Sequence, residues 1–266
     1  MLNKYITMKF IKLVLFSLVT LIFSSCLDTE EKIVVKGDNS GTYSMTLDLG
    51  KMLEMAASMG ANPDSSNTKE KKDTTIYLKN YLDTASNITA EEKALYHDGM
   101  LSMKMDEENN EMKIMVSCPF KKISDLALIK NNLFNVIQKL KAFENATGEK
   151  SKGNGNEDMK MGMKSSNPIS DQFTFSASAG KISNTITNIE AYKAKIAADS
   201  TLSMMSQMSA MMGDFKYRTI LVLPKVVKRY DGPGSSISTD KKTLTFETTL
   251  TEMMEHPEKV SYLVEY

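Results

Sequence analysis

The feature that most constrains this chain is a pattern that occurs three times, in which two short alternating segments around a turn precede apolar residues at helical spacing. The first begins with Ile33-Val34-Val35 and continues with Tyr43, Met45 and Leu47, which alternate with polar residues. Such alternation is typical of a strand with one buried face. Because long strand–helix–strand alternation is absent, the pattern predicts an α+β fold, with an antiparallel sheet built from hairpins and helices packed on one face.

The later parts of the chain repeat and extend this pattern. Capping boxes at 89–92, 187–190 and 249–252 predict three helix starts. Helical spacing predicts a helix over 126–140, and the spacing after the box at 187–190 predicts one from 188 to 213. Alternation predicts strands over 100–105, 112–117, 173–177, 181–186, 215–223, 236–239, 244–248 and 260–266.

Two polar, low-complexity segments interrupt the predicted domain. Residues near 61–74 and 145–170 contain few large apolar side chains, so they cannot bury enough surface to order themselves. We therefore expect a single α+β domain over 32–266 with flexible insertions at these two places.

The N-terminus has the order expected of a secretory signal over residues 1–25. Lys9 and Lys12 precede an apolar run from Leu13 to Phe23, followed by Ser24-Ser25-Cys26. The run is shorter than the roughly 20 apolar residues that span a bilayer. The alternatives are an uncleaved anchor helix and a buried core helix.

The segment Phe23-Ser24-Ser25-Cys26 resembles the lipobox of bacterial lipoproteins. The resemblance implies that Cys26 is diacylated on sulfur, becomes the first mature residue and is acylated on its new amino group. Residues 26–31 would then be a lipidated tether, and the protein would be held in the cell envelope by its acyl chains. Leu27 stands where the inner-membrane retention signal has Asp, so we expect the outer membrane rather than the inner, on either its periplasmic or its surface face.

A second resemblance concerns the folded part. The turn and strand over 37–43 and the closing hairpin over 237–246 resemble the LppM-type family of bacterial lipoproteins. This resemblance implies an α+β domain related to lipid-binding modules, and hence binding of a lipid or another hydrophobic ligand. It transfers no catalytic residue.

Composition excludes several functions. The 33 basic and 33 acidic residues balance, which argues against nucleic-acid binding. The arginines are Arg218 and Arg229 alone, so bidentate phosphate recognition is not a theme of the chain. Cys118 remains alone once Cys26 is lipidated, which excludes an intramolecular disulfide.

Candidate catalytic groups are few, and no cofactor motif is present. The two histidines, His97 and His256, stand where short helices are predicted to end, and an enzyme would require one of them to meet carboxylates in a cleft. Cys118 would need a nearby histidine to act as a nucleophile. We expect structural roles for all three.

A methionine-rich tract offers an alternative. Met159, Met161 and Met163 lie beside Glu157-Asp158 and resemble copper(I)-binding thioether tracts. Methionines between 204 and 212 could add ligands, although their helical spacing also suits core packing.

The sequence therefore predicts a non-enzymatic, lipid-anchored envelope protein that binds a hydrophobic ligand or a protein partner. The alternatives are a structural or assembly lipoprotein without a ligand and a copper(I)-binding lipoprotein.

Overall fold

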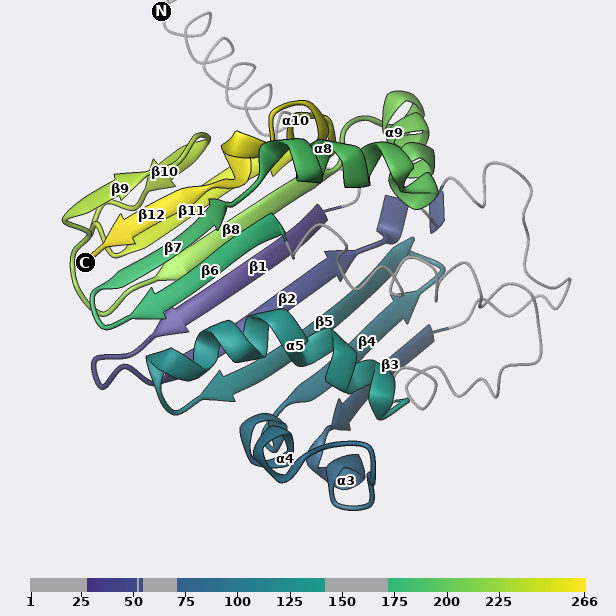
Figure 1. Cartoon of the computed structure of the whole chain (residues 1–266). Coiled ribbons are helices and arrows are strands. Elements are labelled where there is room, and N and C mark those ends of the chain that lie inside the picture. Colours follow the sequence, from purple (N-terminus) through teal and green to yellow (C-terminus); the bar gives the residue numbers. More distant parts are fainter. Residues whose placement is uncertain (1–27, 52, 55–70, 142–171) are drawn as a thin grey trace, which may run out of the picture.

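A computed structural model of the chain describes residues 28–51, 53–54, 71–141 and 172–266. These residues form an α+β fold with two sheets, and Figure 1 shows their arrangement. The predicted signal peptide, Cys26 and the predicted insertion at 145–170 lie outside the described residues.

The larger sheet has the strand order β10-β11-β8-β1-β2-β5-β4-β3. β1 and β8 pair in parallel, whereas the other pairings in the described part of the chain are antiparallel. Most of the chain lies between β1 and β8, which is long enough for the crossover that parallel pairing requires. In sheet order, the strands are β10 (Ser235–Ile237), β11 (Thr243–Thr249), β8 (Lys216–Val222), β1 (Asp28–Val35), β2 (Gly41–Asp48), β5 (Glu111–Phe120), β4 (Met100–Asp106) and β3 (Lys71–Tyr77).

The smaller sheet has the strand order β6-β7-β12-β9. Its strands are β6 (Phe173–Ser178), β7 (Lys181–Ile186), β12 (Tyr262–Glu265) and β9 (Arg229–Asp231). It covers the part of the larger sheet around β1 and β8, while α5 covers the part around β2 and β5 (Figure 1). The helical segments are α3 (Lys79–Leu82), α4 (Ala90–Tyr96), η1 (Ile123–Asp125), α5 (Leu126–Lys139), α8 (Ile189–Ala198), α9 (Ser200–Met212), α10 (Leu250–Glu255) and η3 (Pro257–Val260).

The inner face of the larger sheet is built by alternation along each strand. Strand register places Phe246, Thr219, Glu31, Met45 and Val116 in one row across five strands. Residues two positions away along each strand point to the same face. The core therefore lies between this face and the layer formed by α5 and the smaller sheet.

Helix α5 follows the predicted apolar stripe. Leu126, Ile129 and Leu133 are fully buried, and burial of each such side chain contributes about 1.5–3 kcal/mol. The predicted helix over 126–140 is therefore confirmed to within a residue.

Two of the three predicted capping boxes form. The Thr89 and Thr249 side chains accept the Glu92 and Glu252 backbone N–H groups, and each glutamate accepts the N–H of its cap residue. The third helix starts one residue later than predicted, because the Asn188 side chain accepts the backbone N–H of Ala191 and takes the cap position.

Several boundaries differ from the sequence prediction. One sheet was predicted and two are present, with a parallel pair at the centre of the larger one. The predicted helix from 188 to 213 is divided at Asp199, whose backbone is extended. Acidic residues 28–31, predicted as tether, belong to β1 because their backbone pairs with β2 on one side and β8 on the other. The predicted insertion at 61–74 overlaps β3, which begins at Lys71, while 61–70 lie outside the described residues.

Candidate functional site

A cavity of about 180 Å³ lies between the two sheets, bordered by α5 and η3. We call it the Glu31 pocket, and we define it by Glu31, Lys130, Phe175, Tyr217, Phe246 and Tyr262. These residues come from β1, α5, β6, β8, β11 and β12, so the pocket exists only once both sheets and α5 are assembled.

Glu31 is the buried charge of this pocket. It lies on the same face of β1 as Ile33 and is only 1% exposed. The Lys130 ammonium forms an ion pair with one carboxylate oxygen, Oε1. The hydroxyls of Tyr217 and Thr219 donate to the other oxygen, Oε2, at 3.2 and 3.4 Å. Both oxygens are thus satisfied, as a buried carboxylate requires.

Lys130 joins α5 to the large sheet. It occupies the helical stripe one turn after Leu126, and its side chain is 16% exposed. Its Nζ also lies 5.1 Å from the centre of the Phe175 ring, within the range of a cation–π contact. One side chain therefore connects β1, α5 and β6 across the layers.

Three tyrosines surround the carboxylate. Burial, followed by the negative charge of Glu31, raises the pKa of Tyr43, Tyr217 and Tyr262 well above the usual phenol value. The Tyr262 ring stacks on Phe246 with centroids 4.7 Å apart. Within the part of the chain that the structure describes, its buried hydroxyl has no hydrogen-bond partner. A buried hydroxyl without a partner costs about 1–3 kcal/mol, so this group is available to a ligand or to water.

The pocket suits a small, uncharged molecule. Its central charges, Glu31 and Lys130, neutralise each other, and its walls include the rings of Phe173, Phe175 and Phe246. An engineered apolar cavity of about 150 Å³ accommodates benzene, so 180 Å³ holds a single ring. It is smaller than the roughly 300–1,000 Å³ of common ligand pockets and does not accommodate a whole diacyl lipid.

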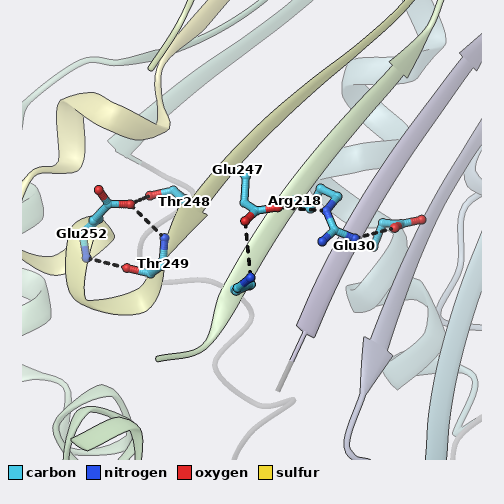
Figure 2. Close-up of polar contacts among 7 residues, drawn as sticks. Glu30, Arg218, Glu247, Thr248, Thr249 and Glu252 are labelled. Atoms are coloured by element: carbon cyan, nitrogen blue, oxygen red, sulfur yellow. Dashed lines mark hydrogen bonds and ion pairs between the residues drawn. The ribbon is translucent and has the colours of Figure 1, made fainter. Parts of the chain in front are cut away.

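The opposite face of the large sheet carries paired charges. Arg218 donates from Nε to Glu247 at 3.2 Å and from a terminal nitrogen to Glu30 at 3.5 Å (Figure 2). The Lys216 ammonium lies 3.6 Å from the carboxylate of Glu247. Glu30 and Glu31 are adjacent in sequence but point to opposite faces, because side chains alternate along a strand.

The histidines are not brought together. His97 lies beside Asp98 after α4, with 2.7 Å between Nδ1 and Oδ1, and both side chains are exposed. His256 follows α10 and lies 3.3 Å from Glu258, again with both side chains exposed. Neither histidine borders the Glu31 pocket. Among the described residues, no group of three or more His, Cys, Asp or Glu side chains is arranged to hold a metal ion.

Cys118 is a buried thiol near the end of β5, as predicted. Its Sγ lies 3.7 Å from the carbonyl oxygen of Leu95. Burial, with a smaller contribution from Asp98, raises its pKa to about 12. It is therefore protonated at neutral pH and is not an activated nucleophile.

The remaining candidates stay predictions. Cys26 and the tract Met159, Met161 and Met163 lie outside the described residues. In α9, the Met204 side chain is 55% exposed, whereas Met205 packs partly against the core.

The Glu31 pocket was not predicted from the sequence, although two local signals for it are present there. Glu31 is in phase with Ile33 and Val35 on the strand, and Lys130 is in phase with Leu126 and Leu133 on the helix. A charge in phase with apolar residues indicates a buried position, but the pairing of the two charges required the tertiary structure.

The described residues thus define an α+β protein with a small mixed-polarity pocket between two sheets. No family model matches the chain, and no curated protein matches it significantly. Among solved structures, it is similar to the folded domain of LppM from Mycobacterium tuberculosis, with a TM-score of 0.36, 8% identity and 91% coverage of each chain. In the described parts of the chain, no helix is both long enough and apolar enough to cross a bilayer.

Proposed function

We propose that this protein is a lipid-anchored binding protein of the bacterial cell envelope, attached through Cys26, that holds a small uncharged molecule in the Glu31 pocket. The anchoring half rests on the N-terminal order of lysines, apolar run and Ser24-Ser25-Cys26. The binding half rests on one observation, the buried Tyr262 hydroxyl without a partner beside a cavity of about 180 Å³.

The geometry of the pocket supports a narrower class of ligand than the hydrophobic ligand expected from the sequence. Aromatic walls favour a flat apolar body, and Tyr262 favours one hydrogen-bonding group on it. A charged ligand would compete with the Glu31–Lys130 ion pair at a desolvation cost of several kcal/mol. The ligand is therefore a single-ring or similarly compact molecule with one hydroxyl or carbonyl group.

The proposal includes no catalytic step. Its support is that His97 and His256 are exposed away from the pocket, while burial raises the pKa of the Cys118 thiol to about 12. Acid–base or nucleophilic chemistry needs such groups within hydrogen-bond reach of a substrate.

The anchor is tested by Cys26→Ser. We expect the native protein to float with membranes and to have the mass of a chain starting at an acylated residue 26. The variant should lose both properties, because the acyl chains provide the attachment. Separation of inner and outer membranes then tests the predicted outer-membrane location. Equal flotation and equal mature mass for both proteins would refute the anchor.

The pocket is tested with phenol and benzyl alcohol as probes. Saturable binding measured by calorimetry or NMR should weaken severalfold in Tyr262→Phe, because the variant lacks the hydroxyl that bonds the probe. Tyr192→Phe is the matched control, since the Tyr192 hydroxyl already donates to the Met253 carbonyl at 2.9 Å. Absence of saturable binding to the native protein, or equal binding by both variants, would contradict the proposal.

A structural or assembly lipoprotein is the second candidate. Its supporting observation is the Glu30–Arg218–Glu247 row on the outer face of the large sheet, where a polar protein partner could contact paired charges. Charge reversal at Arg218 should then remove a co-purifying envelope protein while leaving phenol binding unchanged. Copper(I) binding by Met159, Met161 and Met163 stays a prediction from sequence.

A further inference from the structure

The start of β1 determines how close the body lies to its anchor. Asp28 is the first residue of β1, only two positions after Cys26. Two residues span at most about 7 Å. If Cys26 is acylated, as proposed above, one end of the large sheet must therefore lie next to the lipid headgroups.

Strand register identifies that end. Asp28 pairs with Asp48 on β2 and with Lys216 on β8. We call this the anchor end, defined by Asp28, Asp48 and Lys216. The β1–β2 hairpin lies at the opposite end, because β1 extends a further seven residues, or about 23 Å, to Val35.

Helix α9 is held beside the anchor end. Only residues 213–215 separate α9 from Lys216. The Asp214 carboxylate accepts from the Ser209 hydroxyl at 3.1 Å and from the Thr251 backbone N–H at 3.3 Å, which ties the last turns of α9 to α10. Figure 1 shows α9 beside the end of the sheet at which β1 begins.

The composition of α9 fits a lipid surface. Residues 200–212 include five methionines and Leu202 but no Asp, Glu, Lys or Arg. Leu202 and Met205 pack partly against the core, while Met204 is 55% exposed. The exposed side chains of the helix include Ser203 and Gln207 as well as Met204. Contact of this face with lipid headgroups therefore desolvates no charged side chain of α9, and burial of Met204 at the acyl boundary is favourable. The charges at the anchor end are partly paired, with Lys113 and Asp48 separated by 3.3 Å.

We propose that the anchor end and α9 lie on the surface of the bilayer that holds the Cys26 acyl chains, with Met204 at the headgroup–acyl boundary. This orientation rests on the proposed lipidation and goes beyond it, because a lipid anchor on a long tether would leave the body free to rotate. It directs the β1–β2 hairpin and α4 away from the membrane.

The test places a bimane fluorophore at position 204 of the full lipidated protein, through Met204→Cys. The matched control is Leu128→Cys, since Leu128 is 56% exposed and lies in the first turn of α5, at the opposite end of the sheet. Cys118 is buried and Cys26 is blocked by acylation, so each variant carries one reactive thiol. Both proteins are reconstituted into phosphatidylethanolamine–phosphatidylglycerol vesicles that contain lipids with brominated acyl chains.

We expect the bromine to lower the fluorescence at position 204 by about half and to leave position 128 unchanged, since interfacial helices lie about 5–10 Å into the boundary region. Equal fluorescence at both positions, on protein that floats with the vesicles, would overturn the orientation while leaving the anchor intact. Protein that does not float would overturn the anchor and the orientation together. In a parallel sample of the unlabelled Met204→Cys protein, a disulfide-linked dimer formed on mild oxidation would show that a second copy, rather than lipid, covers α9.

Discussion

Removing the Lys130 ammonium from the Glu31 pocket tests whether the buried Glu31–Lys130 ion pair stabilises the fold. Lys130→Met keeps the length and apolar stem of the side chain but leaves the Glu31 carboxylate, 1% exposed, without its ion-pair partner. Loss of one member of a buried pair typically costs about 3–5 kcal/mol. We expect about 3 kcal/mol, because the Tyr217 and Thr219 hydroxyls still donate to the carboxylate.

The assay is urea denaturation of the unlipidated Cys26→Ser protein, followed by circular dichroism. With a denaturant slope near 3 kcal/mol/M, a loss of about 3 kcal/mol lowers the midpoint by roughly 1 M. The control is Lys259→Met, which borders the same pocket but breaks a half-exposed pair with Glu252 at 2.8 Å. Exposed pairs contribute roughly 0–1 kcal/mol, so this midpoint should move little.

The double variant Glu31→Gln with Lys130→Met separates charge from packing. A neutral amide can still accept from Tyr217 and Thr219, so we expect the double variant to be more stable than Lys130→Met alone. A stabilising buried ion pair is refuted if Lys130→Met destabilises the protein no more than Lys259→Met does, or if adding Glu31→Gln to Lys130→Met restores no stability.

Three further predictions concern single groups. Tyr262→Phe should leave the free energy of unfolding unchanged or raise it, because the hydroxyl has no partner in the described structure. Tyr192→Phe should lower the free energy of unfolding by about 0.5–1.5 kcal/mol in the same urea assay, because it removes the hydrogen bond to the Met253 carbonyl. Cys118, with its pKa raised to about 12 by burial, should react with a disulfide reagent at pH 8 only after unfolding; rapid reaction of the native protein would contradict its placement. The Lys71 ammonium and the Asn109 amide lower the pKa of Asp106 from 3.8 to about 2. The stabilisation of the folded protein by these contacts is therefore complete above the unfolded-state pKa of Asp106 and is lost as pH falls towards 2. Asp106→Asn should flatten the dependence of the unfolding free energy on pH between these two values. An unchanged slope in the variant would contradict this.

The local elements could be predicted from the sequence because their signals are carried by neighbouring residues. Alternation identified β4, β5, β6 and β7, and helical spacing identified α5. The capping boxes at Thr89 and Thr249 located two helix starts, since a cap depends on residues three positions apart. The α+β class followed from the order of these elements.

The tertiary structure alone decided which elements became neighbours. The parallel pairing of β1 with β8 and the ion pair of Glu31 with Lys130 both join residues about 100 or more positions apart in the sequence. The division of the strands between two sheets depends on such long-range contacts as well. No local periodicity specifies such contacts, because they depend on how whole faces pack against each other. The sequence by itself thus determined most of the strands and helices, and the lipid anchor stays its prediction. Packing of the two sheets around Glu31 created the pocket and placed α9 beside the anchor end.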